Sequence, residues 1–266
     1  MAKRSISSSV NPLGKLFVLV GLLGIIVGVV AVTSQSTSFN FLLQAAERYN
    51  PKIVPGDFSP KITNKYVTLG KGTKLVYEGK TEDGLERVEI TISGKTKKIM
   101  GVNTLVYRDK VWLDGELVED TWDYLAQHKN GDVWYFGEDV NNYENGKLVD
   151  HEGSWLAGKD GAKPGIWVKA NPQVGEVYRQ EYLKGEAEDM VRVLSIKEKV
   201  KVPYGSFTNC LKTYDFTPLD LDSKENKYYC PGVGALVQET DQATGDKVKL
   251  IEVRRGSGGG GDDEED

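Results

Sequence analysis

Cysteine and histidine, the residues that most often carry metal sites and nucleophilic catalysis, are scarce in this sequence. The 266 residues include two of each. No Cys-x-x-Cys pair, no H-E-x-x-H and no G-x-S-x-G sequence occurs in the chain, so the specific motifs of zinc sites and serine hydrolases are missing. We therefore expect no catalytic residue, no resident metal and no cofactor.

The chain also lacks an excess of positive charge. It contains 34 Lys and Arg against 39 Asp and Glu, and five of the acidic residues form the C-terminal DDEED. Without those five the two signs balance, and the absence of a basic stripe argues against a nucleic-acid partner. The acidic tail follows a glycine-rich linker. It is interpreted either as a solvated end or as a segment that binds cations or basic partners.

One long apolar run stands out near the N-terminus. It begins at Leu16, ends at Val32 and contains no charge, which meets the lower limit of about 17 residues for a membrane-spanning helix. Because Lys3, Arg4 and Lys15 precede the run, the positive-inside rule places the N-terminus in the cytoplasm and the rest outside. The alternative is a cleaved signal peptide, which would release a secreted domain.

The apolar run offers one contact between two copies of the chain, and it sets the boundaries of the predicted parts. Gly24 and Gly28 form a small-xxx-small pair that could pack two anchors into a homodimer, although glycine is common in membrane helices in any case. The predicted parts are a cytoplasmic N-terminus (1–14), the anchor (15–33), a linker with a short helix at 39–49 (34–60), an extracytoplasmic β domain (61–255) and the linker and acidic tail (256–266).

The two cysteines, Cys210 and Cys230, are equidistant from Asp220, which lies in a turn-rich stretch. A hairpin centred on Asp220 would bring them opposite each other, and an oxidising exterior would let them form a disulfide. A bridge that closes about 20 residues contributes roughly 3 kcal/mol in the chain-entropy model. Two buried thiols and a catalytic thiol are the alternatives.

Asx-Gly pairs recur along the middle of the chain and predict hairpin turns, because Asn, Asp and Gly readily adopt the positive φ of tight turns. The last four pairs are 16, 15 and 15 residues apart, which leaves strands of about six residues. The pairs are Asp83-Gly84, Asp114-Gly115, Asn130-Gly131, Asn145-Gly146 and Asp160-Gly161. Runs rich in β-branched or aromatic residues occupy 104–107, 110–113, 133–136, 147–149, 177–183, 190–196, 207–216, 227–230 and 248–253. The sequence therefore predicts an all-β, antiparallel meander that closes into a barrel or half-barrel.

Aromatic and acidic side chains in this domain are the candidate ligand-binding groups. Tryptophans in a β domain mostly fill the core, but they can also line a cavity for an apolar or sugar ligand. Two acidic groups follow predicted strands, and their carboxylates are interpreted as solvated turn charges, a calcium site or a glycosidase pair. The candidate residues are Trp134, Trp155, Glu138, Asp139, Glu186, Glu188 and Asp189.

Several segments resemble, in order and spacing, a family of uncharacterised exported β-rich proteins of bacteria and archaea. They are VWYFGEDVNNYENGK, EGSWLAGKDGAKPGI, ANPQVGEVYRQEY, GEAEDM, VPYGSFTNCLKT and KYYCPGVGALV. The resemblance covers most of 61–253 and implies an exported β domain. The family has no established activity, so no functional residue is carried over. Its members typically have Ala at the position of Cys230, which would make the disulfide a local feature.

Three functions are therefore considered. The first is a membrane-anchored extracytoplasmic β domain that binds a small apolar or sugar ligand, or a cell-envelope component, without catalysis. The second is a hydrolase that uses paired carboxylates among Glu138, Asp139, Glu186 and Glu188. The third is a structural surface protein.

Overall fold

The computed structural model describes residues 49–256, which form nineteen strands and one turn of 3-10 helix. The elements are η1 (Pro55–Asp57), β1 (Phe58–Ser59), β2 (Ile62–Thr63), β3 (Thr68–Leu69), β4 (Thr73–Thr81), β5 (Gly84–Ile92), β6 (Thr96–Ile99), β7 (Val102–Leu113), β8 (Glu116–His128), β9 (Val133–Glu144), β10 (Lys147–Asp150), β11 (Trp155–Leu156), β12 (Lys163–Val168), β13 (Val177–Arg179), β14 (Glu181–Tyr182), β15 (Met190–Val202), β16 (Gly205–Phe216), β17 (Lys224–Cys230), β18 (Ala235–Asp241) and β19 (Lys247–Arg254).

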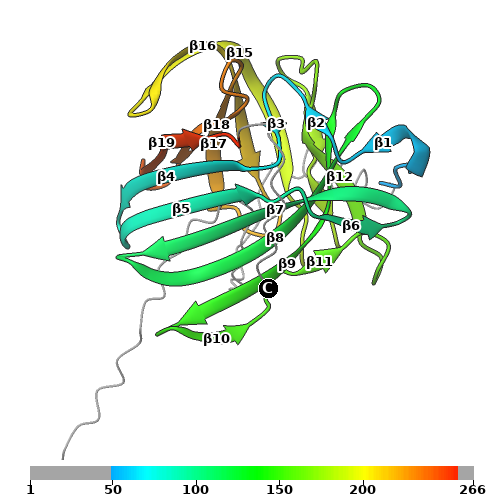
Figure 1. The fold of residues 1–266 in the computed structure, drawn as a ribbon, viewed down its shortest axis with the longest axis horizontal. Helices are drawn as coiled ribbons and strands as arrows, with labels where there is room; N and C mark the ends of the chain where they lie inside the picture. The colour runs from blue at the N-terminus through cyan, green and yellow to red at the C-terminus, as the bar shows by residue number, and fades with distance from the viewer. Residues whose placement is uncertain (1–48, 257–266) are drawn as a thin grey trace, which may run out of the picture.

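The long strands form one antiparallel sheet that curls round on itself (Figure 1). The last strand, β19, pairs with the first long strand, β4. On the other side of the molecule β12 pairs with both β9 and β14, and β13 pairs with β15. The hydrogen-bonded ladder therefore runs round a nearly closed, barrel-like wall, and the predicted all-β antiparallel class is confirmed.

One of the predicted Asx-Gly hairpins shows why those residues are needed, and another pair lies in a loop that is not a hairpin. Asp114 and Gly115 have φ of 49° and 87°, and they join Leu113 to its cross-strand partner Glu116. Both central residues of this turn require positive φ, which Asp and Gly tolerate better than most residues. Asp160-Gly161 differs, because it lies in the loop between β11 and β12, and both of those strands pair with β9 rather than with each other.

The predicted strand length of about six residues was wrong for the wall. Strands β7, β8 and β9 have 12, 13 and 12 residues, and β8 and β9 each extend over the whole interval between successive Asx-Gly pairs. The runs 104–107 and 110–113, predicted as two strands, are parts of β7. Strands β4, β5, β6, β8, β12 and β18 lie outside the predicted runs.

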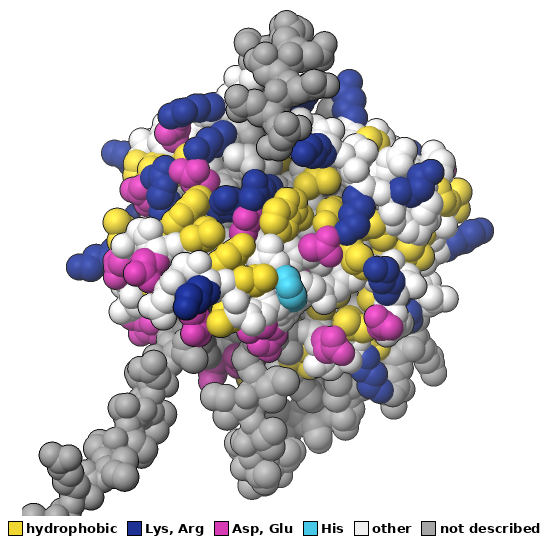
Figure 2. All heavy atoms as spheres, turned by 60° about the horizontal axis from the view of Figure 1, so that its bottom comes forward, with side chains coloured by type: hydrophobic (Ala, Val, Ile, Leu, Met, Phe, Trp, Pro, Cys, Tyr) yellow, Lys and Arg dark blue, Asp and Glu magenta, His cyan; other side chains and the backbone are white. Residues whose placement is uncertain are grey.

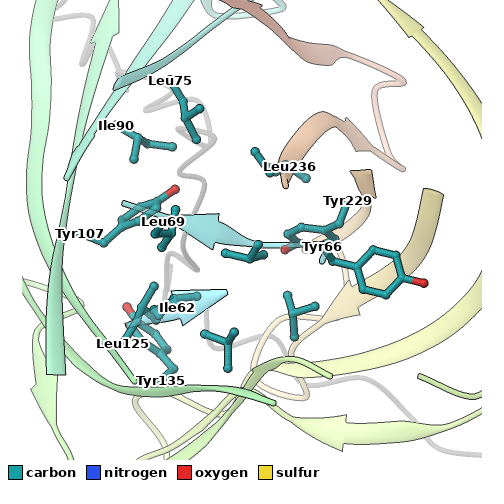
Figure 3. Close-up of a cluster of buried hydrophobic side chains, with 14 of the residues drawn as sticks. Ile62, Tyr66, Leu69, Leu75, Ile90, Tyr107, Leu125, Tyr135, Tyr229 and Leu236 are labelled. Carbon is teal, nitrogen blue, oxygen red and sulfur yellow. The ribbon is translucent and has the colours of Figure 1, made fainter. Parts of the chain in front are cut away.

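A short hairpin inside the wall, made of β2 and β3, closes one end of the interior; we call residues 62–69 the plug hairpin. Ile62, Tyr66 and Leu69 are buried in it, and side chains of the surrounding strands point toward them (Figure 3). The Thr68 N–H donates to the Gly234 carbonyl at 2.7 Å, and Gln127 Oε1 accepts from the Thr63 N–H at 2.6 Å. The plug hairpin is thereby fixed to opposite parts of the wall.

The predicted disulfide is present. Strands β16 and β17 pair with Leu211 opposite Tyr229, a register centred on position 220, and Cys210 is bonded to Cys230. Both cysteines are fully buried. The bridge fixes two neighbouring wall strands and, by the length of the loop it closes, contributes roughly 3 kcal/mol.

The described part begins after the predicted anchor. The run from Leu16 to Val32, the pair Gly24 and Gly28, and the acidic tail lie outside the described residues. Among residues 49–256, no helix is both long and apolar enough to cross a membrane. Strand β1, which precedes position 61, pairs with β8 and so belongs to the sheet.

Candidate functional site

The interior of the wall is apolar at the plug hairpin and acidic toward the opposite end. On β5, buried Ile90 faces the plug (Figure 3), whereas buried Glu86 on the same face lies two residues after the β4–β5 turn. On β7, Tyr107 is followed on the same face by Asp109. The acidic interior consists of seven buried carboxyl side chains, namely Glu86 on β5, Asp109 on β7, Glu119 and Asp123 on β8, Glu138 on β9, Glu181 on β14 and Glu239 on β18.

The strand register makes four of these carboxyls neighbours. Asp123 lies directly opposite Glu138 across β8 and β9. Asp109 lies opposite Thr121, which places it diagonally between Glu119 and Asp123. Directly opposed side chains on one face of a sheet are in contact distance, and diagonal ones are within reach of longer side chains. The four carboxyls therefore form a continuous acidic patch over three strands.

Gly137 allows Glu138 to meet its partner on β11. Its φ is 129°, and a Cβ at this position would lie 2.3 Å from the carbonyl oxygen of Trp155. Glycine therefore permits β11 to approach β9 and to place Trp155 opposite Glu138. The Trp155 Nε1–H donates to Glu138 Oε1 at 3.1 Å.

In several of these carboxyls one oxygen accepts a hydrogen bond, whereas other carboxyl oxygens of the patch have no hydrogen-bond partner. The Tyr135 hydroxyl donates to Asp123 Oδ1 at 2.7 Å, and the Thr121 hydroxyl donates to Glu119 Oε1 at 2.6 Å. Asp123 Oδ2, Glu119 Oε2 and both oxygens of Asp109 are buried without a hydrogen-bond partner. A buried polar atom normally has a partner, because leaving it unpaired costs about 1–3 kcal/mol. These oxygens thus mark a place suited to a proton donor or a cation.

Burial raises the pKa of the carboxyls in this patch. It brings the pKa of Asp123 to about 8 and that of Glu119 to about 7, even though hydrogen bonds from Tyr135 and Thr121 act in the opposite direction. Burial, followed by repulsion from neighbouring carboxylates, raises the pKa of Asp109 and Glu138 well above the usual range. Near neutral pH, much of the acidic interior therefore carries protons.

A buried ammonium group lies among the carboxylates on the other side of the interior. Lys227 Nζ is 3.1 Å from Glu225 Oε2, 3.6 Å from Glu239 Oε2 and 3.8 Å from Asp215 Oδ2. Burial alone would lower the pKa of Lys227, but these carboxylates raise it well above its ordinary value. The fold thus already holds one ammonium ion by a set of inward-facing carboxylates.

The outer surface has a different charge pattern. On the face seen in Figure 2, Lys and Arg side chains are interspersed with Asp and Glu, and hydrophobic side chains lie in small groups between them. On this face, therefore, neither charge sign is concentrated in the way that carboxyls are in the acidic interior.

Of the predicted site residues, Glu138 and Trp155 meet inside the wall, but Asp139 does not join them. Glu138 and Asp139 are not turn charges after a strand at 133–136, as predicted, because β9 continues to Glu144. Strand alternation turns Asp139 outward, where Lys97 Nζ donates to Asp139 Oδ2 at 2.6 Å and the Tyr124 hydroxyl donates to the same oxygen.

The other predicted residues lie elsewhere. Trp134 is half-buried with its ring edge against Phe58. Glu186 is exposed, whereas Glu188 is buried with its Oε2 3.6 Å from Arg179 Nη1. Burial raises the pKa of Asp189 to about 6. The structure therefore does not gather the carboxylates named for a hydrolase into one pair.

No metal centre is evident in the part of the chain that the structure describes. Among residues 49–256, no three or more His, Cys, Asp or Glu side chains are grouped so as to hold a metal ion. Calcium binding stays a prediction.

Sequence reasoning missed Glu86, Asp109, Glu119, Asp123, Glu239 and Lys227. The available signal was a charged residue at an inner position of an alternating strand, as in Leu105-x-Tyr107-x-Asp109 on β7. Such a residue interrupts the hydrophobic pattern, and the predicted run 104–107 ends before Asp109.

Comparisons with known proteins do not assign the chain to a family. No family model matches it, and no curated protein matches it. A solved structure described as a "putative lipoprotein" from Parabacteroides distasonis is similar over 71% of this chain and 98% of its own, with 13% identity and a TM-score of 0.38. Nothing about function follows from a likeness of this degree, and the resemblance to an exported family stays a prediction.

Proposed function

We propose that the chain is a membrane-anchored, extracytoplasmic binding domain without catalytic activity, and that it binds a cationic ligand in the acidic interior. The observation that carries the proposal is the patch of buried carboxyls with unpartnered oxygens on Asp109, Asp123 and Glu119. In a low-dielectric interior such a patch attracts a cation more strongly than it would in water. A bound cation would also supply the missing partners.

The apolar half of the interior favours this ligand over an apolar one. The plug hairpin fills most of it with the chain's own side chains, including Ile62, Tyr66 and Leu69 (Figure 3). The hollow that remains beside Leu69, Tyr107 and Leu236 has a volume of about 20 Å³, which is room for about one water molecule. An apolar or sugar ligand would have to displace the side chains of the plug hairpin. A hydrolase is less well supported, because its paired carboxylates must face one substrate across a cleft, whereas Glu138 is buried and Asp139 faces outward.

Ligand-dependent thermal stability tests the proposal. The full-length protein, purified in a non-ionic detergent, is heated at pH 7.5 with calcium, magnesium, 1,4-diaminobutane, glucose or a fatty acid. We expect at least one of the cations to raise the melting temperature, and glucose and the fatty acid to have no effect, since ligands that bind the native state stabilise it. The Asp123→Asn variant should lose the response. Asp139→Asn, which changes the residue after Glu138 on the outer face of β9, should keep it.

The proposal is wrong if glucose or the fatty acid stabilises the protein. It is also wrong if Asp123→Asn responds to cations in the same way as Asp139→Asn and the wild type. No response to any compound would favour the structural surface protein instead.

The location is a second part of the proposal and has its own test. Support comes from the apolar run that begins at Leu16, the basic residues before it and the disulfide between Cys210 and Cys230. In intact cells of a host that expresses the chain, an external protease should cleave the domain 61–255. Protection until the cells are lysed would place the domain inside and contradict the proposed orientation.

A further inference from the structure

We infer that the ligand of the acidic interior is an organic ammonium ion, a primary amine or diamine with a short alkyl chain, rather than a metal ion. This inference rests on the proposed function and names its ligand class. Three features of the interior support it: the spacing of the carboxyls, the way the fold holds Lys227, and the aromatic rings beside Asp123 and Glu138.

The spacing of the carboxyls suits an ammonium ion better than a metal ion. Calcium takes 6–8 oxygens at about 2.3–2.6 Å, which requires side chains that converge on one point. In the acidic interior the carboxyls are spread over β5, β7, β8, β9, β14 and β18, and no three of them in the described residues are grouped for a metal. An ammonium ion needs only three acceptors at ordinary hydrogen-bond distances.

Lys227 shows that this interior accommodates an ammonium ion. Three carboxylates from β16, β17 and β18 lie within 3.1–3.8 Å of its Nζ. Glu239, one of the three, also contributes to the raised pKa of Asp109, so the two groups of carboxyls adjoin. The same kind of acceptor lies next to Glu239, on Asp109, Glu119 and Asp123. Within the described residues, none of these three carboxyls forms an ion pair with a Lys or Arg.

Aromatic rings next to the carboxyls provide a wall for the alkyl chain. The ring of Tyr135 lies 5.2 Å from that of Trp155 and 5.4 Å from that of Trp167, and Tyr107 lies 5.3 Å from Trp167. Tyr135 and Trp155 donate hydrogen bonds to Asp123 and Glu138, so the rings adjoin the carboxyls directly. The polar edges of these rings, the Tyr135 hydroxyl and the Trp155 Nε1–H, point at the carboxyls, and the ring carbons beside them suit packing against the hydrocarbon of an amine. A metal ion would not use this packing.

Proton release provides a signature of this binding mode. The interior carboxyls carry protons in the free protein near neutral pH, whereas an ammonium ligand is held by their ionised form. Binding must therefore release protons to the buffer, and the affinity must increase with pH between about 6 and 8. The amine itself stays protonated over this range.

Isothermal titration of the full-length protein with 1,4-diaminobutane tests the inference, with calcium chloride and butan-1-ol as comparison ligands. We expect saturable binding of the diamine, no binding of butan-1-ol, and a heat that depends on the ionisation enthalpy of the buffer. Asp109→Asn and Asp123→Asn should weaken the diamine affinity about tenfold or more, as expected for loss of a charged hydrogen bond. Asp139→Asn should bind like the wild type.

The Asp109→Asn and Asp123→Asn variants are expected to fold, because each replaces a buried carboxyl of raised pKa with a group of the same shape. Asp139→Asn changes only a partly exposed ion pair with Lys97. An unchanged circular dichroism spectrum checks that all three variants fold. If calcium binds in the interior and the diamine does not, the ammonium inference fails while the proposed function stands. If neither cation binds, both fail. Diamine binding that all three Asn variants retain would place the ligand elsewhere and overturn the inference.

Discussion

Raising the pH from about 5 to about 8 is expected to destabilise the protein by about 3 kcal/mol or more. Burial raises the pKa of Glu86 and Asp123 to about 8 and that of Glu119 to about 7. In the unfolded chain the same groups have pKa values near 4. At pH 5 and above the unfolded chain has therefore already lost most of these protons, whereas the native state keeps them until the pH reaches about 7 to 8.

The sign of the effect follows from this difference in bound protons. Stability falls with increasing pH wherever the native state holds more protons, by about 1.4 kcal/mol per pH unit for each carboxyl that stays protonated. The contribution is fully present below pH 4 and is lost as the pH rises through the folded-state pKa. Asp57 and Asp139, whose pKa values are lowered by Lys129 and Lys97 respectively, act mainly below pH 5 and do not reverse this trend.

Urea unfolding at pH 5, 6, 7 and 8 measures the effect. The Asp109→Asn and Asp123→Asn variants should show a shallower pH dependence than the wild type, because an amide does not titrate. Asp139→Asn is the matched control and should keep the wild-type slope. A free energy of unfolding that is constant or rises between pH 5 and 8 would show that the interior carboxyls are ionised in the native state.

Replacing Lys227 with methionine is expected to destabilise the protein by about 3–5 kcal/mol at pH 8. The variant removes the buried ammonium and leaves Glu225, Glu239 and Asp215 facing one another without it. At pH 5 the loss should be smaller, since carboxyls without their cation take up protons instead. Urea unfolding of the wild type and the variant at pH 5 and pH 8 measures the loss of stability at each pH.

Lys74→Met is the control for this substitution, because Lys74 forms a partly exposed ion pair with Glu89 on the outer surface. Such pairs contribute at most about 1 kcal/mol. A loss in Lys227→Met no larger than in Lys74→Met, or a loss that does not depend on pH, would contradict the role assigned to the buried ammonium.

The features that sequence reasoning identified correctly depend on few residues close together in the chain. Asp114 and Gly115 predict their turn because the φ values it requires are costly for most other residues. The equal distance of Cys210 and Cys230 from Asp220 predicts their pairing because a hairpin register follows from the position of its turn. These inferences needed no knowledge of distant strands.

Strand β8 and the site were missed for one common reason. Glu119, Thr121 and Asp123 occupy inner positions where the pattern of a half-buried strand calls for apolar residues. A pattern that assumes an apolar interior therefore assigns them to no strand. The same assumption placed Glu138 and Asp139 together in a turn, although they lie on opposite faces of β9.

The sequence by itself determines the all-β class, several turns and the disulfide, because alternation, turn propensity and cysteine spacing act over short stretches of chain. It also carries the apolar run from Leu16 to Val32 on which the proposed location depends. Only the tertiary structure decides that Glu86, Asp109, Asp123 and Glu138 share one interior. Alternation along a strand separates its two faces, but strand pairing and closure of the wall determine which face is inside and which carboxyls become neighbours.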